Sequence, residues 1–176
     1  TGGVIGDALY IACGQTATAE TEVTATLFRL PLPENPGDEN AWESRTWERL
    51  APLPGKPRAQ AAGCVQDGAL YVISGFTLVG DGAGGMQRSY LNDAWRYHPG
   101  GGWERIADVP TGGTVAAPSA PFGETHVLVF GGHDGRDDDL VPMLREKWPG
   151  FSRDILAYHT ITGTWVTLGA MEYGAV

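Results

Sequence analysis

A run of apolar residues that ends in small residues and glycine occurs three times along this chain. The copies are GDALYIACG at 6–14, DGALYVISG at 67–75 and ETHVLVFGG at 124–132. Their final glycines are spaced about 60 residues apart, and repetition at a regular spacing is the signature of folds built from one recurring unit. The repeat therefore limits the fold to an array of similar units.

Three further segments recur around each apolar run. One short segment precedes the run and two follow it, and the last of them contains a tryptophan. In chain order the segments are GGVIG 2–6, TLFRL 26–30 and WERL 47–50; QAAGCV 60–65, DAWRY 93–97 and WERI 103–106; and TVAAPSA 114–120, DILAY 154–158 and WVTL 165–168. Each unit thus contains four predicted strands, and the long segments between strands, at 15–24, 34–45, 77–90 and 133–153, are predicted loops.

The central strand of each unit is apolar at successive positions, so both of its faces must be covered. Sheets stacked face to face around an axis, as the blades of a β-propeller are, provide that cover. The sequence predicts an all-β chain of three four-stranded blades at about 1–54, 55–110 and 111–170. Residues 171–176 would begin another blade.

Tryptophan recurs at one position of each unit, as Trp47, Trp103 and Trp165. Because a single sugar site would not need three copies, we interpret these rings as fillers of the wedge between neighbouring outer strands. Trp42 and Trp148 lie outside the repeat, in loops, where they are candidates for contact with a ligand or a partner.

Composition agrees with short strands joined by turns, because the chain has 26 glycines and 12 prolines. With 12 basic and 21 acidic residues its formal net charge is -9, which opposes binding to nucleic acid or to anionic membranes. No segment approaches the roughly 20 apolar residues of a membrane-spanning helix. We expect neither a nucleic-acid nor a membrane partner.

The sequence offers no clear metal or disulfide framework. Cys13 and Cys64 lie in apolar segments without metal-ligand spacing, and we expect buried free thiols. Four aspartates gather after the third apolar run, at Asp134, Asp137, Asp138 and Asp139. Their order lacks the Asp-x-Asp-x-Asp-Gly pattern and the closing Glu of a calcium loop. We therefore predict a solvated loop and no metal.

The apolar strand with its small-Gly end, the later aromatic-x-Tyr strand and the downstream Trp resemble kelch motifs. GKPRAQAAGCVQDGALYVISG at 55–75, LNDAWRYHPGGGWERI at 91–106 and FSRDILAYHT at 151–160 are similar to one kelch subgroup, the N-acetylneuraminate epimerases, or sialic acid mutarotases. The resemblance covers nearly the whole chain. Cys13 and Ser74 depart from the kelch pattern, because each replaces the first glycine of the usual Gly-Gly pair with another small residue.

Members of that subgroup are six-bladed propellers, so the resemblance implies that three blades form half of a ring. It also implies anomer interconversion of sialic acid without a cofactor, and it suggests a periplasmic or otherwise extracytoplasmic location. A Glu and an Arg on a later blade are proposed to carry the family's chemistry, and no position here corresponds to them. Since open blade faces expose apolar surface, we expect self-association or a missing half to complete the propeller.

Opening and closing the sugar ring at its anomeric centre needs an acid, a base and a cation for the sugar carboxylate. Arg58 is the candidate cation, because it follows Pro57 at the start of an inner strand and a guanidinium binds a carboxylate with two hydrogen bonds. The alternative is an ion pair between Arg58 and a neighbouring Asp at the blade rim. Gln60, two residues on and on the same strand face, would supply an amide contact.

Asn92 and His133 complete the candidate substrate-binding residues. Asn92 and Asp93 precede a strand, where such side chains also commonly bond to their own backbone in turns. His133 follows Gly131–Gly132 at a strand end, and histidine is the side chain most easily tuned for proton transfer near neutral pH; a solvated loop histidine is the alternative. The competing function is a kelch module that binds protein or glycan without catalysis.

Overall fold

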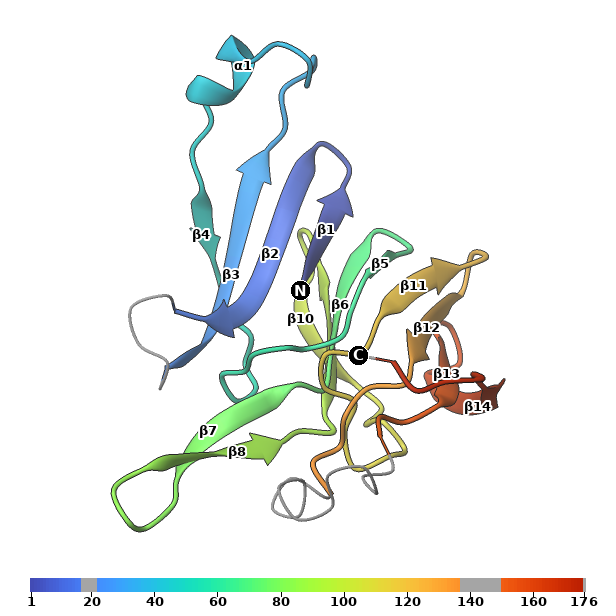
Figure 1. Ribbon diagram of the computed structural model, residues 1–176. Helices are drawn as coiled ribbons and strands as arrows, with labels where there is room; N and C mark the ends of the chain where they lie inside the picture. Colours follow the sequence, from blue (N-terminus) through green and yellow to red (C-terminus); the bar gives the residue numbers. More distant parts are fainter. Residues whose placement is uncertain (17–21, 137–149, 176) are drawn as a thin grey trace.

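A computed structural model describes residues 1–16, 22–136 and 150–175 of the chain (Figure 1). Three antiparallel sheets of four strands each succeed one another. In spatial order they contain β1 (Gly2–Ile5), β2 (Ala8–Gln15), β3 (Val23–Pro31) and β4 (Glu48–Leu50); β5 (Val65–Gln66), β6 (Ala69–Ile73), β9 (Ala94–His98) and β10 (Gly102–Ile106); and β11 (Ser119–Phe122), β12 (His126–Phe130), β13 (Asp154–His159) and β14 (Thr164–Ala170). The predicted all-β architecture of kelch-type blades is confirmed.

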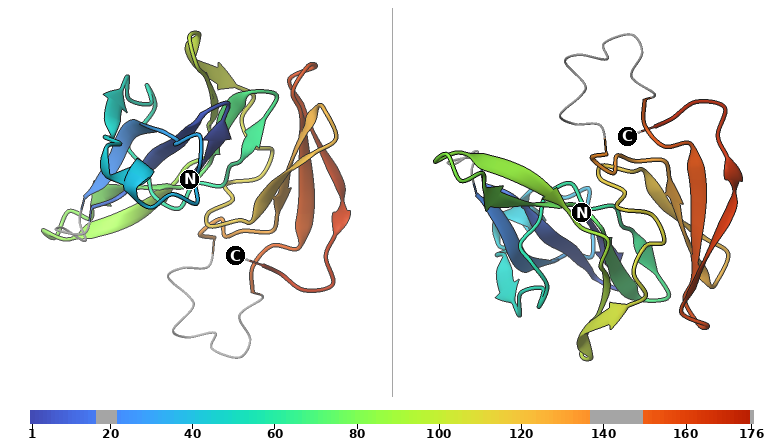
Figure 2. Two further views of the ribbon diagram at one scale, coloured as in Figure 1. Left: turned by 90° about the horizontal axis from the view of Figure 1, so that it is seen from above. Right: turned by 90° about the horizontal axis from the view of Figure 1, so that it is seen from below.

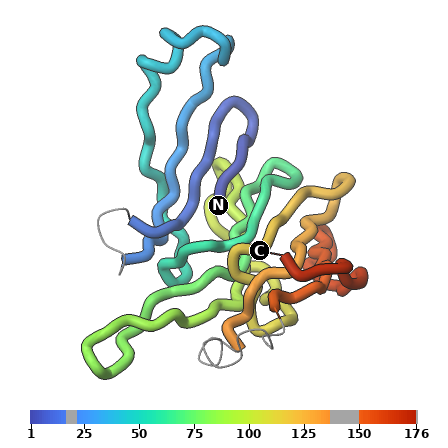
Figure 3. Tube along the Cα trace, viewed as in Figure 1, coloured from blue at the N-terminus to red at the C-terminus, as the bar shows by residue number. Residues whose placement is uncertain are grey.

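The first strand of each sheet lies toward the middle of the molecule. Strand β5 contacts both β1 and β11, whereas β4, β10 and β14 are the outer strands. Seen from above and from below relative to Figure 1, the three sheets spread outward from one side of the molecule (Figure 2). The tube in Figure 3 places both chain ends near the inner strands, and the carbonyl of Ala175 accepts a hydrogen bond from the N–H of Gly132.

The inner strands are shorter than the sequence predicted. The segment 60–65 yields only β5, preceded by an isolated bridge between Ala62 and Ile73, and the segment 114–120 yields β11 at its far end. Gln60 and Ala116 occupy matching positions with φ of 52° and 56°. Because a left-handed residue interrupts extended backbone, each segment bends there before its strand begins.

Residues 77–90 were expected to form a loop, and that expectation is wrong. Strands β7 (Phe76–Gly80) and β8 (Met86–Tyr90) pair as a separate antiparallel hairpin that projects from the second sheet (Figure 1). The Asp81 carboxylate closes the turn by accepting 2.8 Å hydrogen bonds from the backbone N–H groups of Ala83 and Gly85. The short helix α1 (Asn40–Glu43) lies between β3 and β4. Within the described residues, no helix has the length and apolarity needed to cross a bilayer.

Most of the core lies in the two contacts between neighbouring sheets, and a smaller cluster forms around Ala59, Phe76 and Val115. In the first contact Tyr10 meets Tyr97 with 5.9 Å between ring centroids, and in the second Tyr71 meets Tyr158 at 6.1 Å. Around these rings lie the fully buried Ala8, Ala12, Leu27, Leu70 and Val72 on one side, and Ile73, Ala94, Val127 and Val129 on the other. Burial of each large apolar side chain contributes about 1.5–3 kcal/mol, so stacking of the sheets supplies much of the stability.

The repeated tryptophans join one sheet to the next. The indole N–H of Trp103 donates to the carbonyl of Ala51 at 3.0 Å, and that of Trp165 donates to the carbonyl of Ala107 at 2.9 Å. The wedge interpretation is confirmed for these two rings. Trp47, at the same position of the first sheet, is half exposed, because no described sheet packs on that side.

The small residues that replace glycine adopt the same backbone conformation as the glycine would. Cys13 and Ser74 have φ of 60° and 59°. The buried Ser74 hydroxyl donates to the carbonyl of Leu91 and accepts from the N–H of Thr114, both at 2.7 Å, so it links the second sheet to the segment entering the third. Cys13 and Cys64 are free thiols; Cys64 is buried as expected, whereas Cys13 is only partly buried, and burial raises the pKa of each to about 11.

Candidate functional site

Arg58 is the most deeply buried charged side chain among the candidates, with an exposed fraction of 0%. Its backbone N–H donates to the carbonyl of Thr24 and its carbonyl accepts from Gly14, so the residue is held between the first and second sheets. The guanidinium makes two parallel hydrogen bonds to the Asp93 carboxylate, at 2.9 and 2.7 Å. It also donates to the carbonyls of Ser74 and Lys56.

The Asp93 carboxylate has a second partner, because the indole N–H of Trp95 donates to it at 2.6 Å. Partial burial alone would raise the pKa of Asp93, but the hydrogen bonds from Arg58 and Trp95 outweigh burial and leave that pKa below its usual value. The sequence left open whether Arg58 binds a substrate or a neighbouring Asp, and in the structure it pairs with Asp93. A direct contact between Arg58 and a ligand, which stays a prediction, requires Asp93 to release the guanidinium.

A hollow of about 410 Å³ adjoins this ion pair. Its lining residues are Pro54, Gly55, Lys56, Leu91, Asn92, Asp93, Trp95 and Arg105. Asn92 is exposed here, and its carbonyl accepts a 2.8 Å hydrogen bond from the N–H of Val109, which ties down the turn that carries it. Lys56 and Arg105 bring positive charge to the hollow, although Arg105 also pairs with Asp108 at 2.8 Å. The site can therefore accept a polar, anionic small molecule.

His133 lies in a different hollow, on the third sheet. Its half-buried ring makes T-shaped contacts with the rings of Tyr90 and Phe151, at centroid distances of 5.4 and 5.8 Å. This hollow, about 480 Å³, is lined by Gly132, His133, Asp134, Arg136, Gly150, Phe151, Ser152 and Arg153. Arg136 pairs with Asp134, and Arg153 donates to the carbonyl of Met171 at 2.7 Å. The packed rings fix the orientation of the imidazole.

Gln60 lines neither of these hollows. Its side chain is exposed, and its carbonyl accepts a 2.8 Å hydrogen bond from the N–H of Ala116. The next residue, Ala61, bridges to Val115, which in turn bridges to His133. The backbone thus joins Gln60 to the histidine site, whereas Asn92 lines the site beside Arg58. Of the four candidates, Asn92 lines one hollow and His133 lines the other, whereas Arg58 adjoins the first through Asp93 and Gln60 lines neither.

Two predictions about acidic and aromatic loop residues involve parts of the chain outside the described residues. Asp137, Asp138 and Asp139 of the aspartate group lie there, and so does Trp148. Asp134 is described and pairs with Arg136. Trp42 lies on α1 and donates its indole N–H to the carbonyl of Pro36.

Sequence reasoning missed several residues that build the site. We interpreted Asp93 as a residue that bonds to its own backbone in a turn, but its carboxylate accepts from Arg58 and Trp95. The pattern Asp-Ala-Trp contained a usable signal, because residues two apart in a strand share a face. The contact of Tyr90 with His133 had no such signal, since the unpredicted hairpin positions Tyr90.

We expect stability to fall in acid as Asp93 is protonated. Because the folded state lowers the pKa of this carboxyl below its ordinary value of 3.8, the ion pair contributes its full stabilisation above that value and loses it as the pH falls through the folded-state pKa. Urea unfolding between about pH 6 and pH 2 measures this loss. In Asp93→Asn the free energy of unfolding should fall less between these pH values than in the parent protein. An equal fall in both proteins would contradict the assignment.

Comparison with known proteins confirms the resemblance that the motifs indicated. An N-acetylneuraminate epimerase of Yersinia pestis (strain Pestoides F) is 28% identical over 195 residues, which cover 98% of this chain and 45% of the relative. One of Pasteurella multocida (strain Pm70) is 24% identical and covers 98% of this chain and 46% of its own length. One of Escherichia coli O157:H7 is 31% identical over 99 residues, 56% of this chain and 22% of that relative.

A solved structure titled "Structure of YjhT" matches the fold with a TM-score of 0.68 and 16% sequence identity, over 96% of this chain and 44% of that one. No family model matches the sequence. The chain spans about half the length of the curated relatives that it matches over nearly all of its own residues.

Proposed function

We propose that this chain supplies three blades of a kelch propeller that interconverts the anomers of N-acetylneuraminate or a closely related 2-keto sugar acid. The observation that carries the proposal is the similarity of 98% of the chain to proteins named N-acetylneuraminate epimerase. The described hollows are consistent with it, because they present amide, imidazole and cationic groups around spaces of sugar size.

The reaction requires two proton transfers and no change in oxidation state. A base removes the proton of the anomeric hydroxyl, the bond from the anomeric carbon to the ring oxygen breaks, and an acid protonates that oxygen to give the open-chain ketone. Closure on the opposite face of the carbonyl gives the other anomer. The resemblance assigns the acid and the base to a later blade, so the described residues serve binding in this proposal.

We assign direct substrate contacts to Gln60, Asn92 and His133. The first two offer exposed amides, and His133 offers an imidazole oriented by the Tyr90 and Phe151 rings. Arg58 enters as the residue that holds Asp93, and with it the adjoining Asn92 turn, in position through its two hydrogen bonds. Lys56 and Arg105, which line the hollow beside Asn92, provide positive charge for the sugar carboxylate.

Proton NMR of N-acetylneuraminate tests the proposal, because the two anomers have separate resonances whose exchange reports the rate. We expect no acceleration by the 176-residue chain, but saturation transfer from the protein to the sugar. The protein extended past Val176 should accelerate exchange, and Gln60→Ala or His133→Ala in that protein should raise KM about tenfold, the loss expected for one hydrogen bond.

Gln87→Ala is the matched control, because Gln87 is exposed on the projecting hairpin, and it should leave KM unchanged. An extended protein that leaves the exchange rate at its uncatalysed value would overturn the catalytic proposal. Saturation transfer together with that result would instead support the non-catalytic kelch module that binds glycan.

A further inference from the structure

An aspartate occupies the same position in the second and the third sheet. The backbone carbonyl of Asp93 accepts a 3.0 Å hydrogen bond from the N–H of Ser74, and that of Asp154 accepts a 2.8 Å bond from the N–H of Gly131. Ser74 and Gly131 match in the repeat, because each is the first of the two small residues that end an apolar run. The carboxylates of Asp93 and Asp154 can therefore be compared directly.

Arg58, the cationic partner of Asp93, has a threonine as its counterpart. The guanidinium of Arg58 donates to the carbonyl of Ser74 at 3.0 Å. The hydroxyl of Thr114 donates in the same way to the carbonyl of Gly131 at 3.1 Å. A threonine side chain is short, carries no charge and has a single donor, so it cannot supply the two further hydrogen bonds that Asp93 receives. The described part of the third sheet thus keeps the backbone contact without the ion pair.

The second donor to Asp93 has no counterpart either. Trp95 lies two residues after Asp93 and donates its indole N–H to the carboxylate. The residue two after Asp154 is Leu156, whose side chain has no donor. Within residues 1–16, 22–136 and 150–175, the half-buried Asp154 carboxylate forms no hydrogen bond or ion pair, although the backbone N–H of Asp154 donates to the Ser152 hydroxyl at 3.2 Å. A carboxylate that is partly withdrawn from water without a partner is a favourable place for a hydrogen-bond donor.

A small hollow of about 20 Å³ lies beside the Asp154 carboxylate, at the place that corresponds to the Arg58 side chain. Its lining residues belong to the third sheet, its loop or the segment that enters it: Thr111, Gly113, Gly131, Asp134, Arg136, Ser152, Asp154 and Leu156. The volume admits one group of about the size of a water molecule, such as a hydroxyl, but not a guanidinium. Asp134, Arg136 and Ser152 also line the larger hollow of His133, so the two hollows adjoin.

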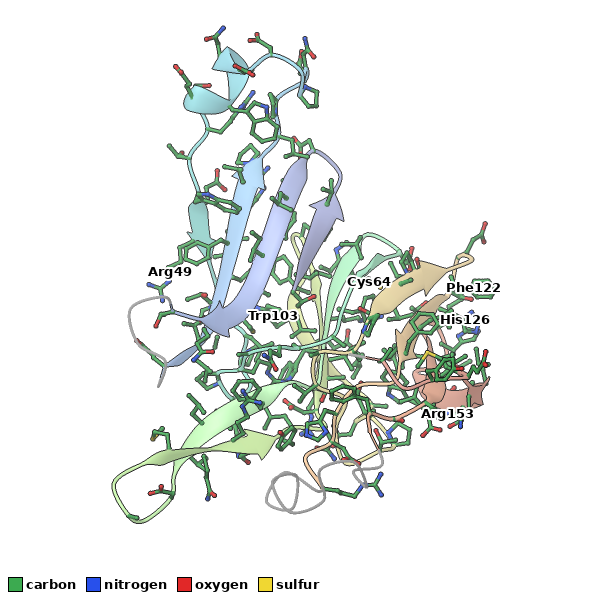
Figure 4. The ribbon with its side chains drawn as sticks, viewed as in Figure 1. Arg49, Cys64, Trp103, Phe122, His126 and Arg153 are labelled. Atoms are coloured by element: carbon green, nitrogen blue, oxygen red, sulfur yellow. The ribbon has the colours of Figure 1, made fainter. Side chains whose placement is uncertain are left out.

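The charges around the small hollow favour a hydrogen-bond donor over an anion. Two acidic side chains and one basic side chain line it, those of Asp134, Asp154 and Arg136. The Nε–H and the backbone N–H of Arg136 both donate to the Asp134 carboxylate. The neighbouring Arg153, labelled in Figure 4 at the start of β13, donates its Nε–H to the carbonyl of Met171. The carboxylate of Asp154 thus remains available to a ligand group.

We propose that Asp154 binds a hydroxyl group of the sugar in this small hollow and thereby favours polyhydroxylated ligands. The inference rests on the proposed function, which places a sugar acid beside His133, and it adds a residue that recognises one of the sugar hydroxyls. An ionised carboxylate only accepts hydrogen bonds, and a hydroxyl can donate one. Because a hydrogen bond to a charged group is stronger than one between neutral groups, its loss should weaken binding about 10–100-fold.

Saturation-transfer NMR titrations of the 176-residue chain test the proposal, with N-acetylneuraminate and the neutral sugars glucose and mannose as probes. Asp154→Ala should raise the Kd of N-acetylneuraminate about 10–100-fold. Asp154→Asn, which keeps a neutral acceptor, should raise it less. Asp7→Ala is the matched control, because the Asp7 side chain is 88% exposed on the first sheet, and it should leave Kd unchanged. If Asp154→Ala leaves the Kd of every bound probe unchanged, the inference is wrong.

Unfolding in urea separates binding from a structural role. Asp154→Asn should leave the midpoint of unfolding unchanged or raise it, because the carboxylate has no partner among the described residues. Asp93→Asn should lower the midpoint, because it breaks the ion pair with Arg58. A fall in Asp154→Asn as large as that in Asp93→Asn would show that Asp154 serves to hold the sheet together, and it would overturn the inference.

Deoxy analogues of N-acetylneuraminate, each lacking one hydroxyl, identify the group that Asp154 binds. One analogue should bind the parent chain and Asp154→Ala equally; if the substitution weakens every analogue by the same factor, Asp154 recognises no hydroxyl and the inference is wrong. The neutral sugars separate this result from the proposed function. If N-acetylneuraminate does not bind but glucose or mannose binds through Asp154, the proposed substrate is wrong and the inference holds. If no sugar binds, both are wrong.

Discussion

Replacement of Asp93 by alanine should lower the free energy of unfolding by about 3–5 kcal/mol, because it leaves the buried Arg58 guanidinium without its counter-charge. The pair is joined by two hydrogen bonds of 2.9 and 2.7 Å, and Arg58 is fully buried while Asp93 is only slightly exposed. The same substitution removes the acceptor for the Trp95 indole. Urea unfolding at one fixed protein concentration measures the effect and avoids changes caused by association.

An exposed ion pair in the same sheet provides the control. Arg96 and Glu104 lie 2.7 Å apart, with side-chain exposed fractions of 34% and 60%. Because exposed pairs contribute only about 0–1 kcal/mol, Glu104→Ala should have a small effect. Equal losses from Asp93→Ala and Glu104→Ala would mean that burial of Arg58 does not set the strength of its pair.

Gly63→Ala should destabilise the protein by more than about 4 kcal/mol, a loss that only severe packing or steric defects reach. A Cβ at this position would lie 2.0 Å from the carbonyl oxygen of Tyr71, which is backbone and cannot move aside. The surroundings are rigid, because the Gly63 N–H donates to the Ser119 hydroxyl and its carbonyl accepts from Thr1 and Ser119. Thermal and urea unfolding measure the loss.

Gly68→Ala separates steric overlap from backbone strain. Gly68 has a φ of 64°, and the nearest atom to its added Cβ is 3.8 Å away on His98. This substitution therefore costs only the roughly 1–2 kcal/mol of a left-handed residue with a side chain. If Gly68→Ala destabilised the protein as much as Gly63→Ala, the close approach of Tyr71 would not explain the effect.

The local pattern of the sequence predicts the sheets well. The three apolar runs appear in the structure as β2, β6 and β12. The aromatic segments that follow them appear as β3, β9 and β13, and the tryptophan segments appear as β4, β10 and β14. Errors arose where a single residue or turn decides the backbone. Gln60 and Ala116 shorten the inner strands, and Asp81 closes a hairpin in a segment that lacks the repeat.

The candidate site was less predictable, because its contacts join distant parts of the chain. Arg58 and Asp93 are 35 residues apart in sequence. A sequence pattern indicated that Arg58 begins an inner strand, but it could not identify the group that the guanidinium meets. Likewise His133 was placed at a strand end, whereas its packing against Tyr90 depends on the hairpin.

The sequence by itself determined that the chain forms three similar sheets stacked face to face, since hydrophobic periodicity and glycine position act within each repeat. The tertiary structure alone decided that Arg58 is buried against Asp93, that Asn92 and His133 line separate hollows, and that the imidazole of His133 packs against Tyr90. These features depend on which side chains meet across sheets. Such meetings are set by packing and desolvation between segments far apart in the chain, which no local pattern records.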